Sequence, residues 1–176
     1  MEITKIALSF YLHPMAQYGV RELSKITQTD TKTVLKYLKE LIKQKIVIRN
    51  HQKGKYPYYE ANRISNLYRH EKSELIIKKI LESGLIEFLE KHLSPKTIVL
   101  FGSVQKGTYH QESDVDIFVQ TKYKNIDIYS FNKKLGHPIQ LFFEENLSAL
   151  SAGLLENIYN GLVLSGKLEV VKLVQI

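Results

Sequence analysis

The sequence predicts an α+β protein with a helical and hairpin N-terminal part, a helical connector, and a C-terminal mixed sheet flanked by helices. Three observations carry this prediction. The hydrophobic period changes from 3.6 to 2 within residues 1–62, and a helical period returns over residues 63–95. Short apolar runs separated by glycine turns then fill residues 96–176. We take these three ranges as the predicted domains.

Composition bounds the functions open to this chain. With 176 residues, 44% of them hydrophobic and 24% charged, the chain fits one ordinary domain or two small ones. The absence of cysteine excludes disulfides, thiolate catalysis, iron–sulfur clusters and cysteine-ligated zinc. No signal peptide and no run of about 20 apolar residues is visible, so we expect a cytoplasmic protein that does not enter the membrane.

The charge is unevenly distributed along the chain. The net charge is +7, and residues 1–60 hold 11 basic against 5 acidic side chains. Residues 61–95 hold 6 against 5, and residues 96–176 hold 8 against 8. Almost the whole excess lies in the first third, which is typical of an anion-binding module attached to a neutral domain.

The N-terminal part predicts a bundle of three helices. Apolar side chains recur at helical spacing in three stretches, at 2–12, 20–25 and 31–44. Asp30 or Thr29 can cap the third helix. The inner faces are assigned the apolar residues Ile3, Ile6, Ala7, Phe10, Tyr11, Val20, Leu23, Ile26, Val34, Leu35, Leu38, Leu41 and Ile42. The opposite face of the third helix carries Lys32, Thr33, Lys36, Lys39, Lys43 and Lys45.

A basic hairpin is predicted to follow the three helices. Residues 46–49 and 56–60 alternate in the manner of strands, and the polar segment 51–55 between them contains one glycine and two lysines. The tyrosines of the second strand are interpreted as packing residues of the hairpin: Tyr56, Tyr58 and Tyr59.

Three helices and a basic hairpin, with the segments 20–25, 31–41 and 46–49, resemble the winged helix-turn-helix of prokaryotic transcription regulators. The resemblance covers residues 1–62 and implies DNA binding in transcription regulation, with the third helix in the major groove. The expected DNA contacts are Thr31, Lys32, Thr33, Lys36, Lys53 and Lys55. Lysines supply phosphate contacts, whereas no Arg, Asn or Gln begins the third helix to read bases. Docking of a partner protein and a plain scaffold are the alternatives.

The connector is predicted to form two helices. Apolar and charged residues alternate with helical period, Ser83 and Gly84 interrupt the run, and Pro95 ends it. One face is too apolar for solvent, so the connector either packs on the next domain or pairs with its copy. Because winged-helix regulators often dimerise through flanking helices, the resemblance of residues 1–62 implies a homodimer.

The C-terminal part contains a motif with fixed spacing. An apolar run at 97–101 leads into Gly-Ser-Val-Gln-Lys-Gly at 102–107, and five residues later comes Ser-Asp-Val-Asp at 113–116, followed by another apolar strand. This arrangement resembles the polymerase-beta-like nucleotidyltransferase superfamily, in particular its minimal branch, over about residues 96–145. The resemblance implies a nucleotidyltransferase-type mixed sheet flanked by helices.

The resemblance also implies a reaction: transfer of a nucleoside monophosphate from a triphosphate, with ATP expected, to a hydroxyl acceptor with Mg²⁺. Asp114 and Asp116 are two apart on a predicted strand, so both carboxylates leave the same face and offer hard oxygen ligands. They are the expected catalytic and metal-binding residues. The expected nucleotide-binding residues are Gly102, Ser103, Lys106, Gly107, Ser113 and Gln140. The Lys106 side chain is expected either to contact the phosphates or to face solvent.

Active members of the superfamily carry a third carboxylate on a later strand, and the matching position here is Gln140. It lies in the predicted strand 139–143, after a predicted helix at 126–135 and a turn. Glutamine donates and accepts hydrogen bonds but cannot act as a general base. Glu144 shares that strand face but lies about 13 Å along it.

Two classes of function therefore stay open. The first is an enzyme that adds a nucleotide to a protein, an RNA or a small molecule. The second is a transcription regulator whose nucleotidyltransferase domain only senses nucleotide. Small nucleotidyltransferases of this kind also occur in toxin–antitoxin pairs, which implies a toxin-like partner protein.

The remaining residues predict a helix at 146–160 and a terminal hairpin of 163–164 with 168–174, which complete a core.

Overall fold

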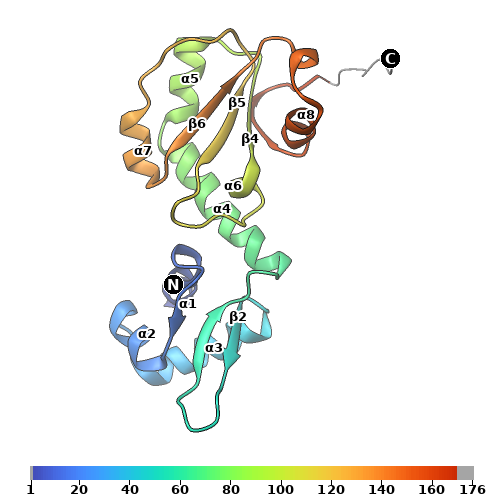
Figure 1. The fold of residues 1–176 in the computed structure, drawn as a ribbon. Coiled ribbons are helices and arrows are strands. Elements are labelled where there is room, and N and C mark those ends of the chain that lie inside the picture. The colour runs from blue at the N-terminus through green and yellow to red at the C-terminus, as the bar shows by residue number, and fades with distance from the viewer. Residues whose placement is uncertain (1, 170–176) are drawn as a thin grey trace. The chain divides into compact units, whose positions relative to one another are not determined.

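The chain divides into two compact units, Met1–Lys72 and Ser73–Ile176, here called the N-terminal unit and the C-terminal unit. Figure 1 shows the computed structural model, which describes residues 2–169. Helix α4 (Asn66–Glu82) is continuous across the boundary between the two units. Within residues 2–169, no helix is long and apolar enough to cross a membrane.

The N-terminal unit contains three helices and a three-stranded antiparallel sheet (Figure 1). The helices are α1 (Glu2–Leu12), α2 (Val20–Thr27) and α3 (Thr31–Lys43). The strands are β1 (Gln17–Tyr18), β2 (Val47–Asn50) and β3 (Tyr58–Ala61), in the order β1-β3-β2. The helices and the β2–β3 hairpin confirm the predicted elements. Strand β1 is too short to show an alternation in the sequence.

Helix α3 begins at a side-chain cap and buries one stripe of apolar residues. The Oδ1 atom of Asp30 accepts a hydrogen bond from the backbone N–H of Thr33 at 2.9 Å. Hydrogen bonds with the side chain and, to a smaller extent, the backbone of Thr33 lower the pKa of Asp30. The fully buried residues of the three helices are Ile6, Phe10, Leu23, Val34, Leu38 and Leu41. Spacings of four and three residues along α3 therefore place one stripe of this helix in the core. The side chain of Ile3 lies outside the described residues.

Two residues assigned to the inner faces lie outside the core. Ile26 is 54% exposed because Thr27, four residues after Leu23, takes the inner position and donates its hydroxyl hydrogen bond to the Leu23 carbonyl at 2.7 Å. Leu35 is 42% exposed because the stripe of α3 that faces the core passes to its other side. The prediction that both pack inward is wrong.

The hairpin corrects one further prediction. Tyr59 is buried, as expected for a packing residue, but Tyr56 is 91% exposed. It precedes β3 and lies with the hairpin tip, whose residues Lys53, Gly54 and Lys55 are all exposed. Tyr56 therefore contributes nothing to hairpin packing.

The C-terminal unit is built on a four-stranded mixed sheet of order β6-β5-β4-β7. Its strands are β4 (Thr97–Phe101), β5 (Val115–Val119), β6 (Ile139–Phe143) and β7 (Leu162–Gly166). Strands β5 and β6 are parallel, and the other pairs are antiparallel. The helices are α5 (Leu85–Leu93), α6 (Gly102–Gln105), α7 (Tyr129–Leu135) and α8 (Ala152–Tyr159), with a 3₁₀ turn at Leu147–Ala149. The predicted mixed sheet flanked by helices is confirmed.

Different helices pack on the two faces of this sheet. On one face, α4, α5 and α7 pack against alternate strand residues such as Leu100 and Ile117. On the other face, α8 packs against the intervening residues Val99, Phe101 and Phe118. The connector helices therefore pack on the sheet of the C-terminal unit, which confirms the first of the two alternatives for the connector.

Two predicted helices are shorter in the structure. The predicted helix at 126–135 begins only at Tyr129, because the Asp127 carboxylate accepts a hydrogen bond from the Tyr129 backbone N–H at 2.9 Å and forms a turn there. The predicted helix at 146–160 is divided into the 3₁₀ turn and α8. Ser151 caps α8 by accepting from the backbone N–H of Leu154 at 3.4 Å.

The second strand of the predicted terminal hairpin falls mostly outside the described residues. Residues 163–164 lie in β7, which pairs with β4. After Gly166, at φ +74°, Leu168 packs against the core on the α8 face of the sheet, and the Glu169 carbonyl accepts from the Tyr159 hydroxyl at 3.3 Å. Residues 170–174 of the predicted second strand lie outside the described residues.

Candidate functional site

The predicted site residues meet where β4 ends and where β5 and β6 begin. Asp116 lies opposite Phe101 of β4 on one side and opposite Gln140 of β6 on the other. Neighbouring strands are about 4.8 Å apart, so Gln140 is the direct lateral neighbour of Asp116. Asp114 lies one residue before β5. The register thus joins segments that are up to 39 residues apart in the sequence.

Asp116 faces the side of the sheet on which α8 packs. It alternates with Val115 and Ile117, which belong to the core on the opposite face, and it shares its face with Phe118. Asp116 is partly buried, whereas Asp114 and Gln140 are exposed. The three polar side chains therefore border solvent next to an apolar core.

Gly102 is required by the local geometry. Its φ is +76°, and a Cβ built on it would lie 2.2 Å from Oδ2 of Asp116. The chain thus turns from β4 into α6 directly against the Asp116 carboxylate, which only glycine permits. The predicted glycine loop therefore lies against Asp116 of the predicted carboxylate pair.

Replacing Gly102 by Ala is expected to lower the free energy of unfolding by about 2 kcal/mol. Gly136 is the matched control, because its φ is +73° but nothing lies within 4 Å of an added Cβ. Gly136→Ala is expected to cost only about 1 kcal/mol, from backbone strain alone. Urea unfolding of both variants measures the difference. Equal losses would show that the contact with Asp116 has no energetic consequence.

The carboxylate pair carries an electrostatic cost. Burial raises the pKa of Asp116 above its usual range, and the neighbouring charge of Asp114 raises it further. Two neighbouring carboxylates of this kind favour a bound cation, because a cation relieves their repulsion. Within residues 2–169, no group of three or more His, Cys, Asp or Glu side chains is placed to hold a metal ion.

The other predicted nucleotide-binding residues each have their own local hydrogen bonds or turn geometry. Lys106 ends α6, and its Nζ donates to Oδ1 of Asn157 on α8 at 3.3 Å. The Ser113 Oγ accepts from the His110 backbone N–H at 2.9 Å and closes the turn before the aspartates. Ser103 is partly buried, and its carbonyl accepts from the Thr108 backbone N–H at 3.0 Å. Gly107 follows α6 with φ +67°.

One residue near the site is not visible in the sequence pattern. His137 lies in the turn before β6, and its Nδ1–H donates to the carbonyl of Ser113 at 2.9 Å. The backbone N–H of Val115 donates to Pro138 in the same turn at 2.8 Å. His137 thus holds the segment that carries Asp114 beside the start of β6. Only the parallel pairing of β5 with β6 brings these residues together, so no local motif could have indicated it.

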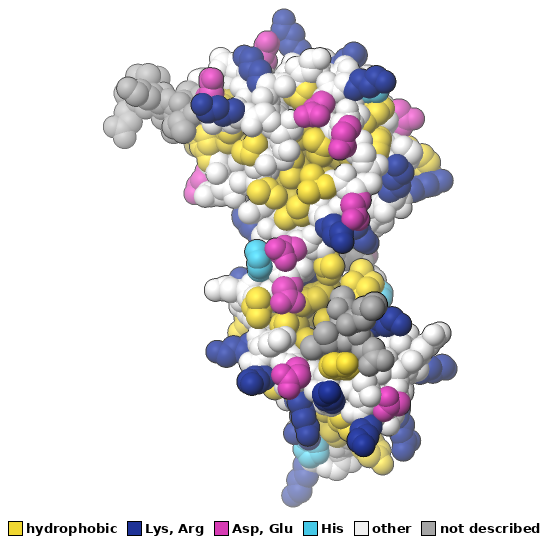
Figure 2. All heavy atoms as spheres, turned by 180° about the vertical axis from the view of Figure 1, so that it is seen from behind, with side chains coloured by type: hydrophobic (Ala, Val, Ile, Leu, Met, Phe, Trp, Pro, Cys, Tyr) yellow, Lys and Arg dark blue, Asp and Glu magenta, His cyan; other side chains and the backbone are white. Residues whose placement is uncertain are grey.

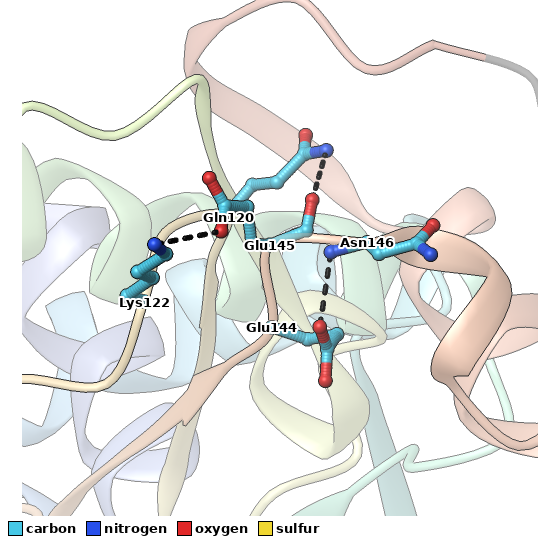
Figure 3. A network of polar contacts seen from close by, with 5 residues as sticks. All are labelled: Gln120, Lys122, Glu144, Glu145 and Asn146. Carbon is cyan, nitrogen blue, oxygen red and sulfur yellow. Dashed lines mark hydrogen bonds and ion pairs between the residues drawn. The ribbon is translucent and has the colours of Figure 1, made fainter.

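Glu144 belongs to the opposite end of the sheet. Figure 3 shows it in a polar network with residues that follow β5 and β6. The Glu144 carboxylate accepts from the Asn146 backbone N–H at 2.9 Å. Beside it, Gln120 Nε2 donates to the Glu145 carbonyl at 3.2 Å, and Lys122 pairs with the Glu145 carboxylate at 3.9 Å. Glu144 therefore stabilises a turn and does not supply the missing third carboxylate.

Comparison with known protein families gives one finding for this region. Residues 82–166 match the family model described as "Polymerase beta, Nucleotidyltransferase". Comparisons with curated proteins and with solved structures gave no significant match. The matched range contains the glycine turn, both aspartates, Gln140 and all four strands of the mixed sheet. Residues 82–166 are therefore similar to nucleotidyltransferase domains of the polymerase-beta type.

Proposed function

We propose that the C-terminal unit binds a nucleoside triphosphate, with ATP expected, together with Mg²⁺ and transfers the nucleoside monophosphate to a hydroxyl acceptor. The observation that supports this proposal is the close approach of Gly102 to Asp116, one of the two predicted carboxylates. Asp114 and Asp116 would hold the metal, which in this chemistry neutralises charge on the phosphates. Ser103 would donate its hydroxyl to a phosphate oxygen, and Gly102 keeps that approach open.

The reaction has a defined balance. The acceptor oxygen forms a bond to the α-phosphorus. The bond between the α-phosphorus and the oxygen that bridges it to the β-phosphate breaks, and pyrophosphate leaves. The acceptor hydroxyl must also lose its proton. Gln140, beside Asp116, cannot take that proton, although its amide can hydrogen-bond the acceptor hydroxyl. Transfer is therefore expected to be slow.

Labelled nucleoside triphosphates test this proposal. Wild-type protein is incubated with Mg²⁺ beside Asp114→Asn/Asp116→Asn, and both retained nucleotide and transferred label are measured. Transfer by the wild type that disappears in the variant supports the enzyme. Absence of both binding and transfer in the wild type contradicts the proposed site.

A second candidate function is a transcription regulator whose nucleotidyltransferase domain only senses nucleotide. The position of Gln140 favours it, because the register gives Asp116 a neutral neighbour where a third carboxylate is expected. In the experiment above, nucleotide binding without transfer supports this candidate. DNA affinity measured with and without nucleotide then shows whether nucleotide binding changes the affinity of the protein for DNA.

We also propose that the N-terminal unit is a winged helix-turn-helix that binds DNA. Three helices precede the β2–β3 hairpin, and Lys32, Lys36, Lys53 and Lys55 are all exposed. Thr31 is exposed at the start of α3, and Thr33 is partly buried. Lys and Arg side chains are spread over this unit (Figure 2). This distribution of charge supports contacts with phosphates, which are independent of sequence.

Removing two lysines from α3 is expected to weaken the salt dependence of DNA binding. In Lys32→Ala/Lys36→Ala, the slope of log affinity against log salt should fall by about 2, because each lost phosphate contact contributes roughly 0.9. Lys91→Ala/Lys167→Ala is the control, since both lysines are exposed in the C-terminal unit. Equal slopes for the wild type and the α3 variant would contradict the assignment of α3 to DNA.

A further inference from the structure

The exposed face of α3 contains an apolar side chain among its polar residues. Leu35 is 42% exposed, and its neighbours on the helix surface are Thr31, Lys32 and Lys39, at four residues before, three before and four after. All three are exposed. Leu35 thus lies next to the residues that we propose for DNA contact, in the first half of the helix.

Leu35 lies outside the fully buried stripe of α3. The stripe of Val34, Leu38 and Leu41 is at most 2% exposed and fills the inner side of α3. The other exposed residues of the helix are lysines, one threonine and Glu40, so this face has no Arg, Asn or Gln that could make a bidentate contact with a base. A base-reading role therefore has to come from a different kind of contact.

We propose that Leu35 reads thymine through van der Waals contact with its 5-methyl group in the major groove. This inference rests on the proposed DNA binding of the N-terminal unit. The thymine methyl is the apolar group among the base edges of the major groove, and apolar side chains recognise it. Lys32, Lys36 and Lys39 carry charge complementary to the phosphates and hold the helix against the duplex without reading sequence. The preferred partner is accordingly duplex DNA with thymine at the contacted step.

The test compares thymine with uracil, which pairs identically and lacks only the methyl group. A duplex is first selected with the wild-type full chain from a pool with a random core, and is then remade with deoxyuridine in place of thymidine. Burial of one methyl group corresponds to about a fourfold change in affinity. The wild type is expected to bind the thymine duplex about fourfold more tightly for each methyl contacted.

Leu35→Ala is expected to lose this preference and to keep the salt dependence, because it removes no phosphate contact. Leu67→Ala is the matched control, since Leu67 is also a leucine with 42% exposure and lies in α4. It should keep the wild-type ratio of thymine to uracil affinity. Thermal unfolding of both variants checks that each is folded.

The outcomes separate this inference from the function on which it rests. If the wild type binds no duplex at low salt, the proposed DNA binding fails, and the inference fails with it. If the wild type binds thymine and uracil duplexes equally, DNA binding stands and the role of Leu35 is overturned. A preference for thymine that persists in Leu35→Ala also overturns it.

Discussion

Gln140→Glu is expected to raise the rate of Mg²⁺-dependent nucleotidyl transfer by about 100-fold or more. The substitution keeps the length of the side chain and supplies a carboxylate beside Asp116, at the position that resembles the third carboxylate of active nucleotidyltransferases. This carboxylate can accept the proton of the acceptor hydroxyl and adds a third oxygen ligand for the metal. Release of pyrophosphate from labelled triphosphate measures the rate.

The control for this prediction is Gln140→Glu in the Asp116→Asn background, where no gain is expected because the metal pair is broken. An unchanged rate in Gln140→Glu, with nucleotide binding retained, would show that Gln140 does not limit transfer. The sensor function would then lose the observation that favours it.

Lys72→Met is expected to raise the free energy of unfolding at pH 7 by about 1 to 3 kcal/mol. Lys72 is 1% exposed in α4. Burial lowers its pKa from 10.5 to about 8, and the charge of Arg63 contributes in the same direction. At pH 7 the folded protein therefore keeps a charged ammonium group whose desolvation cost exceeds what its contacts return, among them the Tyr68 ring at 6.0 Å from Nζ. Methionine removes this charge while preserving the aliphatic part of the side chain.

The pH dependence has a definite sign. The unfolded chain keeps the Lys72 proton up to about pH 10.5, whereas the folded protein releases it near pH 8. The contribution of Lys72 to stability therefore rises with pH between these values, and it is absent in Lys72→Met. Urea unfolding from pH 7 to 10 measures it, with the exposed Lys79→Met in the same helix as control. No gain at pH 7 would contradict the account of this lysine.

The elements with the strongest local patterns were predictable from the sequence. The apolar run at 97–101 is buried at all five positions in β4, as a run without polar interruption indicates. The spacing of the glycine turn and the two aspartates indicated that they belong to one site, and in the structure Gly102 lies against Asp116. The family match over residues 82–166 supports the predicted domain. The homodimer and the toxin-like partner protein stay predictions.

Features that depend on tertiary contacts were not predictable. Strand β1 exists only through its pairing with β3, and the neighbourhood of Gln140 and Asp116 depends on the parallel pairing of β5 with β6. Side chains on the border of a helix stripe were ambiguous as well. Ile26 and Leu35 fit the apolar period, but their neighbours take the inner positions. Local hydrogen bonds accepted by the side chains of Asp127 and Ser151 set the starts of α7 and α8 later than the apolar period alone indicated.

Equilibrium binding of labelled ATP to the full chain, as Mg²⁺ is titrated, tests the central claim most directly. The wild type is compared with Asp114→Asn/Asp116→Asn and with Glu144→Gln, which changes a carboxylate at the other end of β6. We predict Mg²⁺-dependent binding by the wild type and by Glu144→Gln, and loss of that dependence in the double variant. Equal binding by all three proteins would contradict the assignment of Asp114 and Asp116 to the metal and nucleotide.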